Sequence, residues 1–204
     1  MFRAAKTFLG VAFGTLVMGC GGSPGLALNE LTLQEAEELA AATMFATFDV
    51  TSVVPPRPSG LPLLDADPVG WAVDFEAEVR CPAAGRVGLA VAALVRADAT
   101  GGERVDYDLT QIHDGCGVDR SGEHRFTVSG SPRSMASVSV RHDGFGRVEW
   151  AGRASGEVRW QQSDREGACT FDVTLSGRSD ETMASATVVG SMCGQPIDRT
   201  IGLR

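Results

Sequence analysis

A period of two in hydrophobicity begins at Val69, and it limits more than any other feature how this chain can fold. Successive side chains of a strand point to opposite faces, so such a period predicts a strand with one buried and one solvated face. The apolar phase is Trp71, Val73, Phe75, Ala77 and Val79, and the other phase is Ala72, Asp74, Glu76, Glu78 and Arg80. A strand of this kind is typical of antiparallel sheets.

A turn at residues 82–85 leads into a return strand over residues 87–95. Its second face is also apolar, so we expect it to be covered on both sides, with an N-terminal helix as one cover. That second face consists of Gly88, Ala90, Ala92 and Leu94.

Shorter strands follow, separated by turns rich in Gly, Asp and Ser, as in antiparallel β domains. They are predicted at 104–112, 124–130, 134–141, 147–152, 156–161, 168–176, 184–192 and 196–203. We therefore predict a mainly β fold, an antiparallel meander that forms a curved sheet or partly closed barrel with one N-terminal helix packed on it. A regular immunoglobulin sandwich is less expected, because its Cys–Trp–Cys signature is missing.

The predicted helix covers residues 30–48 and starts with a capping box, Thr32-Leu33-Gln34-Glu35. Apolar residues recur along it at steps of three and four residues, which indicates a helix face that packs against another element. This stripe comprises Leu33, Ala36, Ala40, Met44 and Phe48. Prolines at 55, 56 and 58 then predict an extended connector that runs to about residue 68.

The first residues have the order of a secretory signal: Arg3 and Lys6, an apolar run over residues 7–18, and a cysteine. The segment Leu16-Val17-Met18-Gly19-Cys20 resembles the lipobox of bacterial lipoproteins. This resemblance covers only the targeting segment. It implies cleavage before Cys20 and lipid on that cysteine, which would hold the protein at a membrane.

The resulting organisation is a signal peptide (1–19), a flexible tether (20–29), the helix and connector (30–68) and the β domain (69–204). Gly21 stands where aspartate marks retention at the inner membrane in many diderm bacteria. By resemblance to that sorting rule, we expect a location in the cell envelope at the outer membrane. The order of a lipobox, a short helix and a disulfide-linked β meander resembles that of uncharacterised bacterial envelope lipoproteins. This resemblance implies no particular activity.

The chain has 26 acidic and 18 basic residues and a net charge of −8. Loss of Arg3 and Lys6 with the signal would bring the charge to −10 and leave no lysine. An acidic chain is poorly suited to nucleic acid, so we expect no nucleic-acid partner. The missing lysine excludes Schiff-base chemistry, a P-loop lysine and a Ser–Lys dyad.

Four cysteines remain besides Cys20, an even number that indicates two disulfides in an exported chain. Positions 169 and 193 are symmetric about residue 181 in a predicted turn, which places Cys169 opposite Cys193. Cys81 closes the first strand and Cys116 follows the third, so both lie at one end of a meander. We predict Cys81–Cys116 and Cys169–Cys193; zinc is the alternative, but it lacks any C-x-x-C pair.

Two patterns suggest metals only weakly. Residues 65–76 match part of an EF-hand loop, but Val69 offers no side-chain oxygen and a strand follows where a helix should stand. His113 and His124, with Asp114, surround the Cys116 loop. The tripeptide His-Asp-Gly occurs at 113–115 and again at 142–144, and each copy ends a predicted strand. The preference of Asp-Gly for hairpin turns explains both copies, so we predict no metal and no cofactor.

We expect no catalytic residues, because no Gly-x-Ser-x-Gly nucleophile motif is present. Trp150 and Trp160 flank small residues, which predicts a groove between them as a possible binding surface. The favoured function is a non-catalytic envelope lipoprotein, a binding or structural module with a protein or glycan partner. The alternatives are a carrier of small apolar ligands on the concave sheet face and, more weakly, an anchored hydrolase at His113 and His124.

Overall fold

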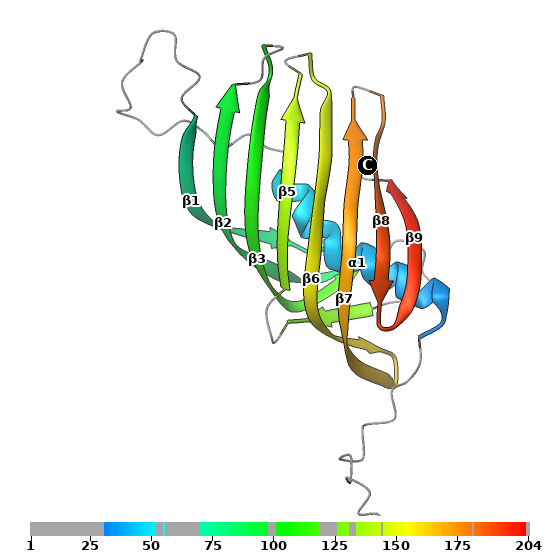
Figure 1. Ribbon diagram of the computed structural model, residues 1–204. Helices are drawn as coiled ribbons and strands as arrows, with labels where there is room; N and C mark the ends of the chain where they lie inside the picture. The colour runs from blue at the N-terminus through cyan, green and yellow to red at the C-terminus, as the bar shows by residue number, and fades with distance from the viewer. Residues whose placement is uncertain are drawn as a thin grey trace, which may run out of the picture.

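The computed structural model describes residues 31–51, 55, 70–97, 101–118, 126–130, 134–143, 145–180 and 182–202. In these ranges one helix lies against one sheet of nine strands (Figure 1). The elements are α1 (Leu33–Thr51), β1 (Trp71–Arg80), β2 (Ala84–Ala97), β3 (Glu103–Val118), β4 (Phe126–Ser129), β5 (Ser134–His142), β6 (Val148–Gln162), β7 (Arg165–Ser179), β8 (Ala184–Met192) and β9 (Gln195–Gly202).

Every strand pair is antiparallel, and the order is β1-β2-β3-β4-β6-β7-β8-β9. Strand β5 also lies between β3 and β6. It pairs with β3 from Glu103 to Gln111, and β4 pairs with the far end of β3 from Cys116 to Val118. Strands β4 and β5 therefore act as one interrupted strand, and the predicted antiparallel meander with a packed helix is confirmed.

One predicted pair of strands is a single element. The stretches predicted at 147–152 and 156–161 form one strand, β6, which begins at Val148 and pairs with β5 up to Ser155 and with β4 from Arg159. Gly156 lies between the two parts with a φ of 155°, a conformation that favours glycine. Small residues thus let the strand continue through a change of partner instead of ending it.

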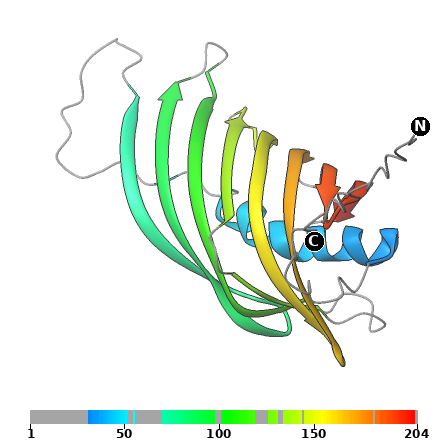
Figure 2. The ribbon, with the colours of Figure 1, turned by 60° about the horizontal axis from the view of Figure 1, so that its bottom comes forward.

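The sheet curves around α1, which occupies its concave side (Figure 2). The predicted capping box is present: the Thr32 amide donates to Glu35 Oε2 at 2.8 Å, and the Glu35 amide donates to Thr32 Oγ1 at 3.3 Å. No helix among the described residues has the length and apolarity needed to cross a membrane.

Burial on α1 extends well beyond the predicted stripe. Ala36, Ala40, Met44 and Phe48 are buried, whereas Leu33 is 49% exposed and does not belong to the buried face. Other faces of the helix are buried too, because the sheet surrounds it on more than one side. The additional buried residues are Glu35, Leu39, Ala42, Thr43, Ala46, Thr47 and Thr51.

The prediction that β2 is covered on both faces is wrong. Val87, Leu89, Val91, Ala93 and Val95 face the core, as the alternation requires. On the outer face Ala90 and Ala92 are exposed, and no described element covers them. The helix covers only the concave side, so β2 presents small apolar side chains to solvent.

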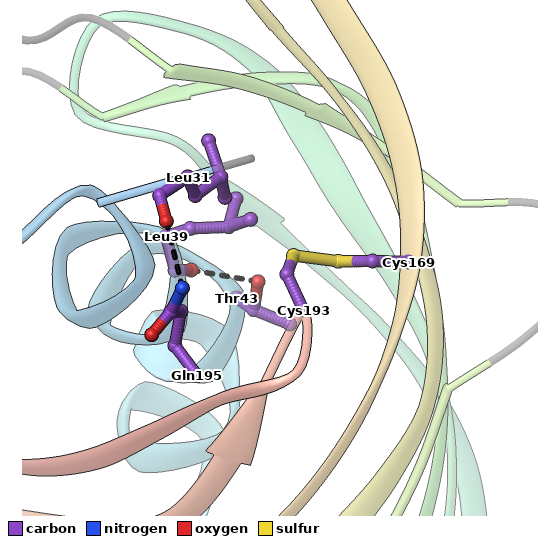
Figure 3. Close-up of a disulfide and its surroundings, with 6 residues drawn as sticks. All are labelled: Leu31, Leu39, Thr43, Cys169, Cys193 and Gln195. Carbon is purple, nitrogen blue, oxygen red and sulfur yellow. Dashed lines mark hydrogen bonds between the residues drawn. A yellow bond between two sulfur atoms is a disulfide. The ribbon is translucent and has the colours of Figure 1, made fainter. Parts of the chain in front are cut away.

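Both predicted disulfides are confirmed. Cys81 and Cys116 have a Cα–Cα distance of 5.4 Å, and Cys169 and Cys193 have one of 4.9 Å. The β7–β8 register pairs Phe171 with Met192, one residue off the predicted symmetry, so Cys193 lies just past the end of β8. Figure 3 shows this disulfide beside the first turns of α1, where Gln195 donates to the Leu31 carbonyl at 3.1 Å.

Candidate functional site

The two tryptophans of the predicted binding surface belong to the core, which corrects that prediction. Trp150 and Trp160 are each 4% exposed. Trp150 makes an edge contact with Phe48 of α1 at 6.4 Å between ring centroids, and Trp160 makes one with Phe126 at 5.9 Å. The buried helix and β4 cover both indoles, so they form no exposed aromatic platform.

His113 lies under the helix and not at the surface. Its Nε2 donates to the Thr43 carbonyl at 3.2 Å, because a carbonyl can only accept; Nδ1 therefore carries the free lone pair. Burial lowers the pKa of His113 and so favours the neutral ring. Asp114 faces the other way and pairs with Arg86 at 3.2 Å. His124 lies outside the described residues.

His113 is part of a buried polar contact between β3 and α1. Gln111 Nε2 donates to Thr47 Oγ1 at 2.6 Å. Gln111 Oε1, His113 Nδ1 and the hydroxyl of Ser134 are buried with no hydrogen-bond partner among the described residues, and Gln111 is the cross-strand neighbour of Ser134. These three atoms are suited to ordered water. No three His, Cys, Asp or Glu side chains in the described part of the chain are grouped to hold a metal.

A second polar contact fixes the start of α1. Arg165 Nη1 donates to Glu35 Oε1 at 2.6 Å, and its guanidinium lies 5.8 Å from the centre of the Trp160 ring. Burial by itself would raise the pKa of Glu35, but hydrogen bonds from the Thr32 amide and from Arg165 hold it below its ordinary value. These contacts position the helix on the concave face of the sheet.

The outer face of the sheet carries a groove of about 740 Å³ over β3, β5, β6, β7 and β8, which we call the arginine groove. Its charged residues form one cross-strand row, in which Arg104 pairs with Arg141, Arg141 with Glu149, and Glu149 with Arg178. Each of the four is second from a strand end, so the row follows the hairpin connections. The full lining is Arg104, Ser139, Arg141, Glu149, Trp150, Ala151, Ser176, Gly177, Arg178, Ser185 and Thr187.

Charge in this groove is unbalanced. Three arginines face one glutamate among the lining residues, although the chain as a whole is acidic. Arg104 pairs with Asp106 at 3.2 Å, but the same carboxylate also pairs with Arg96 at 3.1 Å. Like charges directly opposite each other destabilise a sheet, so the Arg104–Arg141 pair is more costly than a pair of opposite charges.

The rest of the lining supplies hydroxyl groups. The neighbouring row places Ser139 beside Ala151, Ala151 beside Ser176, and Ser176 beside Thr187. With Ser185 these small side chains form a floor of donors and acceptors below the longer arginines. The groove therefore combines bidentate donors for carboxylate or phosphate with a hydroxyl-rich floor.

Sequence reasoning missed this groove although part of the signal was present. Arg104 and Arg141 occupy the outward phase of predicted strands, and Arg178 follows the strand predicted over 168–176; all three lie in or close to a predicted turn. What the sequence did not show was that these three turns lie side by side with their arginines in one row.

No protein-family model, no curated protein and no solved structure matches this chain.

Proposed function

We propose that this protein is a lipid-anchored, non-catalytic binding module of the bacterial envelope, and that its arginine groove holds an anionic glycan. The observation that carries the proposal is the cross-strand row of Arg104, Arg141 and Arg178. Arginine recognises carboxylate and phosphate groups through two parallel hydrogen bonds. A row of such side chains suits a ligand that repeats its charge.

The floor of the groove favours a glycan over a bare anion. Ser139, Ser176, Ser185 and Thr187 offer hydroxyls that can exchange hydrogen bonds with sugar hydroxyls. A uronate or phosphate-bearing saccharide chain would present its charges to the arginines and its hydroxyls to this floor. The groove lies on the solvent-facing side of the sheet, where a polymer can reach it.

Binding rather than catalysis fits the ionisable groups of the groove. Arginine stays protonated at all physiological pH values, so it cannot serve as a general base. Glu149 is the one carboxylate among the lining residues. Such a set holds an anion by charge and geometry but offers little for proton transfer.

A carrier of apolar ligands on the concave face is less well supported, because α1 occupies that face. Leu39, Ala40 and Met44 are fully buried there, and Gln111 and Arg165 hold the helix by hydrogen bonds. A ligand could enter only after the helix had left. The outer face needs no such rearrangement.

The groove is tested with a polyuronate as probe and neutral dextran as its control, using calorimetry on purified protein. We expect the polyuronate to bind, with affinity that falls as salt rises, and R141E/R178E to weaken it at least tenfold. The matched control is R80E/R86E, another cross-strand arginine pair that lies outside the groove. Equal losses in both variants would show diffuse attraction and refute the groove.

The anchor is tested separately in cells. We expect the wild-type chain to fractionate with the outer membrane, and globomycin or Cys20→Ser to block its processing. Cys20 is the residue that the lipobox resemblance marks for lipid. A Cys20→Ser variant that is processed and membrane-bound like the wild type would contradict the lipoprotein assignment without touching the groove.

A further inference from the structure

A second groove, of about 900 Å³, crosses β1, β2, β3 and β5 on the same outer face. Its floor is apolar: Ala90 and Ala92 are exposed, and Met135 is 61% exposed. Its rim carries the carboxylates Asp74, Glu76 and Asp108. We call it the acid-rimmed groove. It shares β3 and β5 with the arginine groove but has the opposite charge.

The register explains its shape. Ala92 lies between Asp74 of β1 and Asp108 of β3, and Ala90 lies between Glu76 and Thr110. Two short methyl side chains on β2 are thus flanked by longer side chains on both neighbouring strands. The result is a channel along β2 with an apolar floor and polar walls.

Two carboxylates on the β1 wall lack a cationic partner among the residues that the structure describes. Asp74 and Glu76 form no ion pair with any described residue, whereas their neighbour Glu78 pairs with Arg86 at 3.2 Å. An apolar partner alone would desolvate these carboxylates without compensation, which is unfavourable. A partner with cations beside its apolar side chains would cover the alanine floor and also neutralise the two carboxylates.

We propose that the acid-rimmed groove docks an extended basic segment of a partner protein, in which lysine or arginine alternates with apolar residues. An extended chain has a period of two, so its apolar side chains can face the alanine floor while alternate residues point away from it. The aliphatic stems of lysine and arginine are long enough to bend back from the docked segment to the carboxylates of Asp74 and Glu76. An apolar patch with a polar rim is typical of protein–protein contacts.

The experiment measures a labelled peptide of alternating lysine and valine by fluorescence anisotropy against the full chain. Two control peptides carry glutamate in place of lysine or serine in place of valine. We expect only the lysine–valine peptide to bind. D74N/E76Q should weaken it at least tenfold, and Ala92→Phe should block it by filling the channel. E157Q/D198N removes two exposed outer-face carboxylates elsewhere and should leave binding unchanged.

Three results would overturn the proposal. The first is no binding of the lysine–valine peptide, and the second is equal binding of the lysine–serine peptide, which would reduce the effect to charge. The third is concentration-dependent self-association of the wild-type chain that D74N/E76Q abolishes, which would make a second copy the occupant. Polyuronate binding by the same variants is measured in parallel, so failure here is distinguishable from failure of the arginine groove.

Discussion

Replacing Glu35 tests whether the polar contacts at the start of α1 hold the helix inside the sheet. Glu35→Ala removes the capping-box carboxylate and the partner of Arg165, which lies 2.6 Å away. Glu35→Gln keeps a side chain that can complete the capping box but removes the charge. The two variants therefore separate the cap from the ion pair.

The expected losses follow from burial. The Glu35 side chain is 8% exposed and that of Arg165 is 35% exposed, so the pair is only partly screened by solvent. A hydrogen bond to a charged group contributes about 1.5–3 kcal/mol, and we take the lower half of that range because Arg165 can regain water. Loss of the cap adds about 0.5–2 kcal/mol. We expect about 1.5–2 kcal/mol for Glu35→Gln and about 2–4 kcal/mol for Glu35→Ala.

The assay is urea unfolding with intact disulfides, followed by tryptophan fluorescence. Trp160 lies under Arg165 and reports on this contact. The control is Glu37→Ala, which breaks a more exposed pair with Arg199 at 3.3 Å and should cost less than about 1 kcal/mol. If Glu35→Ala costs no more than Glu37→Ala, the inference that this contact holds the helix is refuted.

The same contact predicts a pH dependence. The pKa of Glu35 in the fold lies below its ordinary value of 4.5, so the folded state favours the ionised form. Its contribution is present above pH 4.5 and is lost as pH falls through the folded pKa. The stability difference between wild type and Glu35→Gln should therefore shrink in acid; a difference that stays constant would contradict the ion pair.

Three further predictions concern the core. A Cβ on Gly167 would lie 2.7 Å from the buried Trp160 ring, so Gly167→Ala should cost about 1–3 kcal/mol in urea unfolding, while Gly202→Ala, with open space, should not. Because burial lowers the pKa of His113, stability should fall as pH drops below 6.5, and His113→Gln should flatten that profile. Cys81→Ser should lower stability by about 2–4 kcal/mol; an unchanged melting temperature would refute a structural role for this disulfide.

The errors about the tryptophans and about β2 share one physical cause. Alternation shows which side chains share a face, but it does not show which face receives the helix. Trp150 and Trp160 share a phase with Val148 and Val158, and α1 and β4 turn that phase into core. Ala90 and Ala92 were apolar and predicted to be covered, yet the curved sheet leaves their face outside.

The sequence by itself determined the elements of this protein, because their causes are local. A period of two makes strands, Thr32 and Glu35 cap a helix, and the strand pattern predicts the disulfides Cys81–Cys116 and Cys169–Cys193. The tertiary structure alone decided the candidate sites. Arg104, Arg141 and Arg178 are separated by 37 residues at each step, and only the register between strands places them in one row. Register follows from the hydrophobic pattern of several strands and the geometry of the turns between them, so it brings together residues that no single local pattern relates.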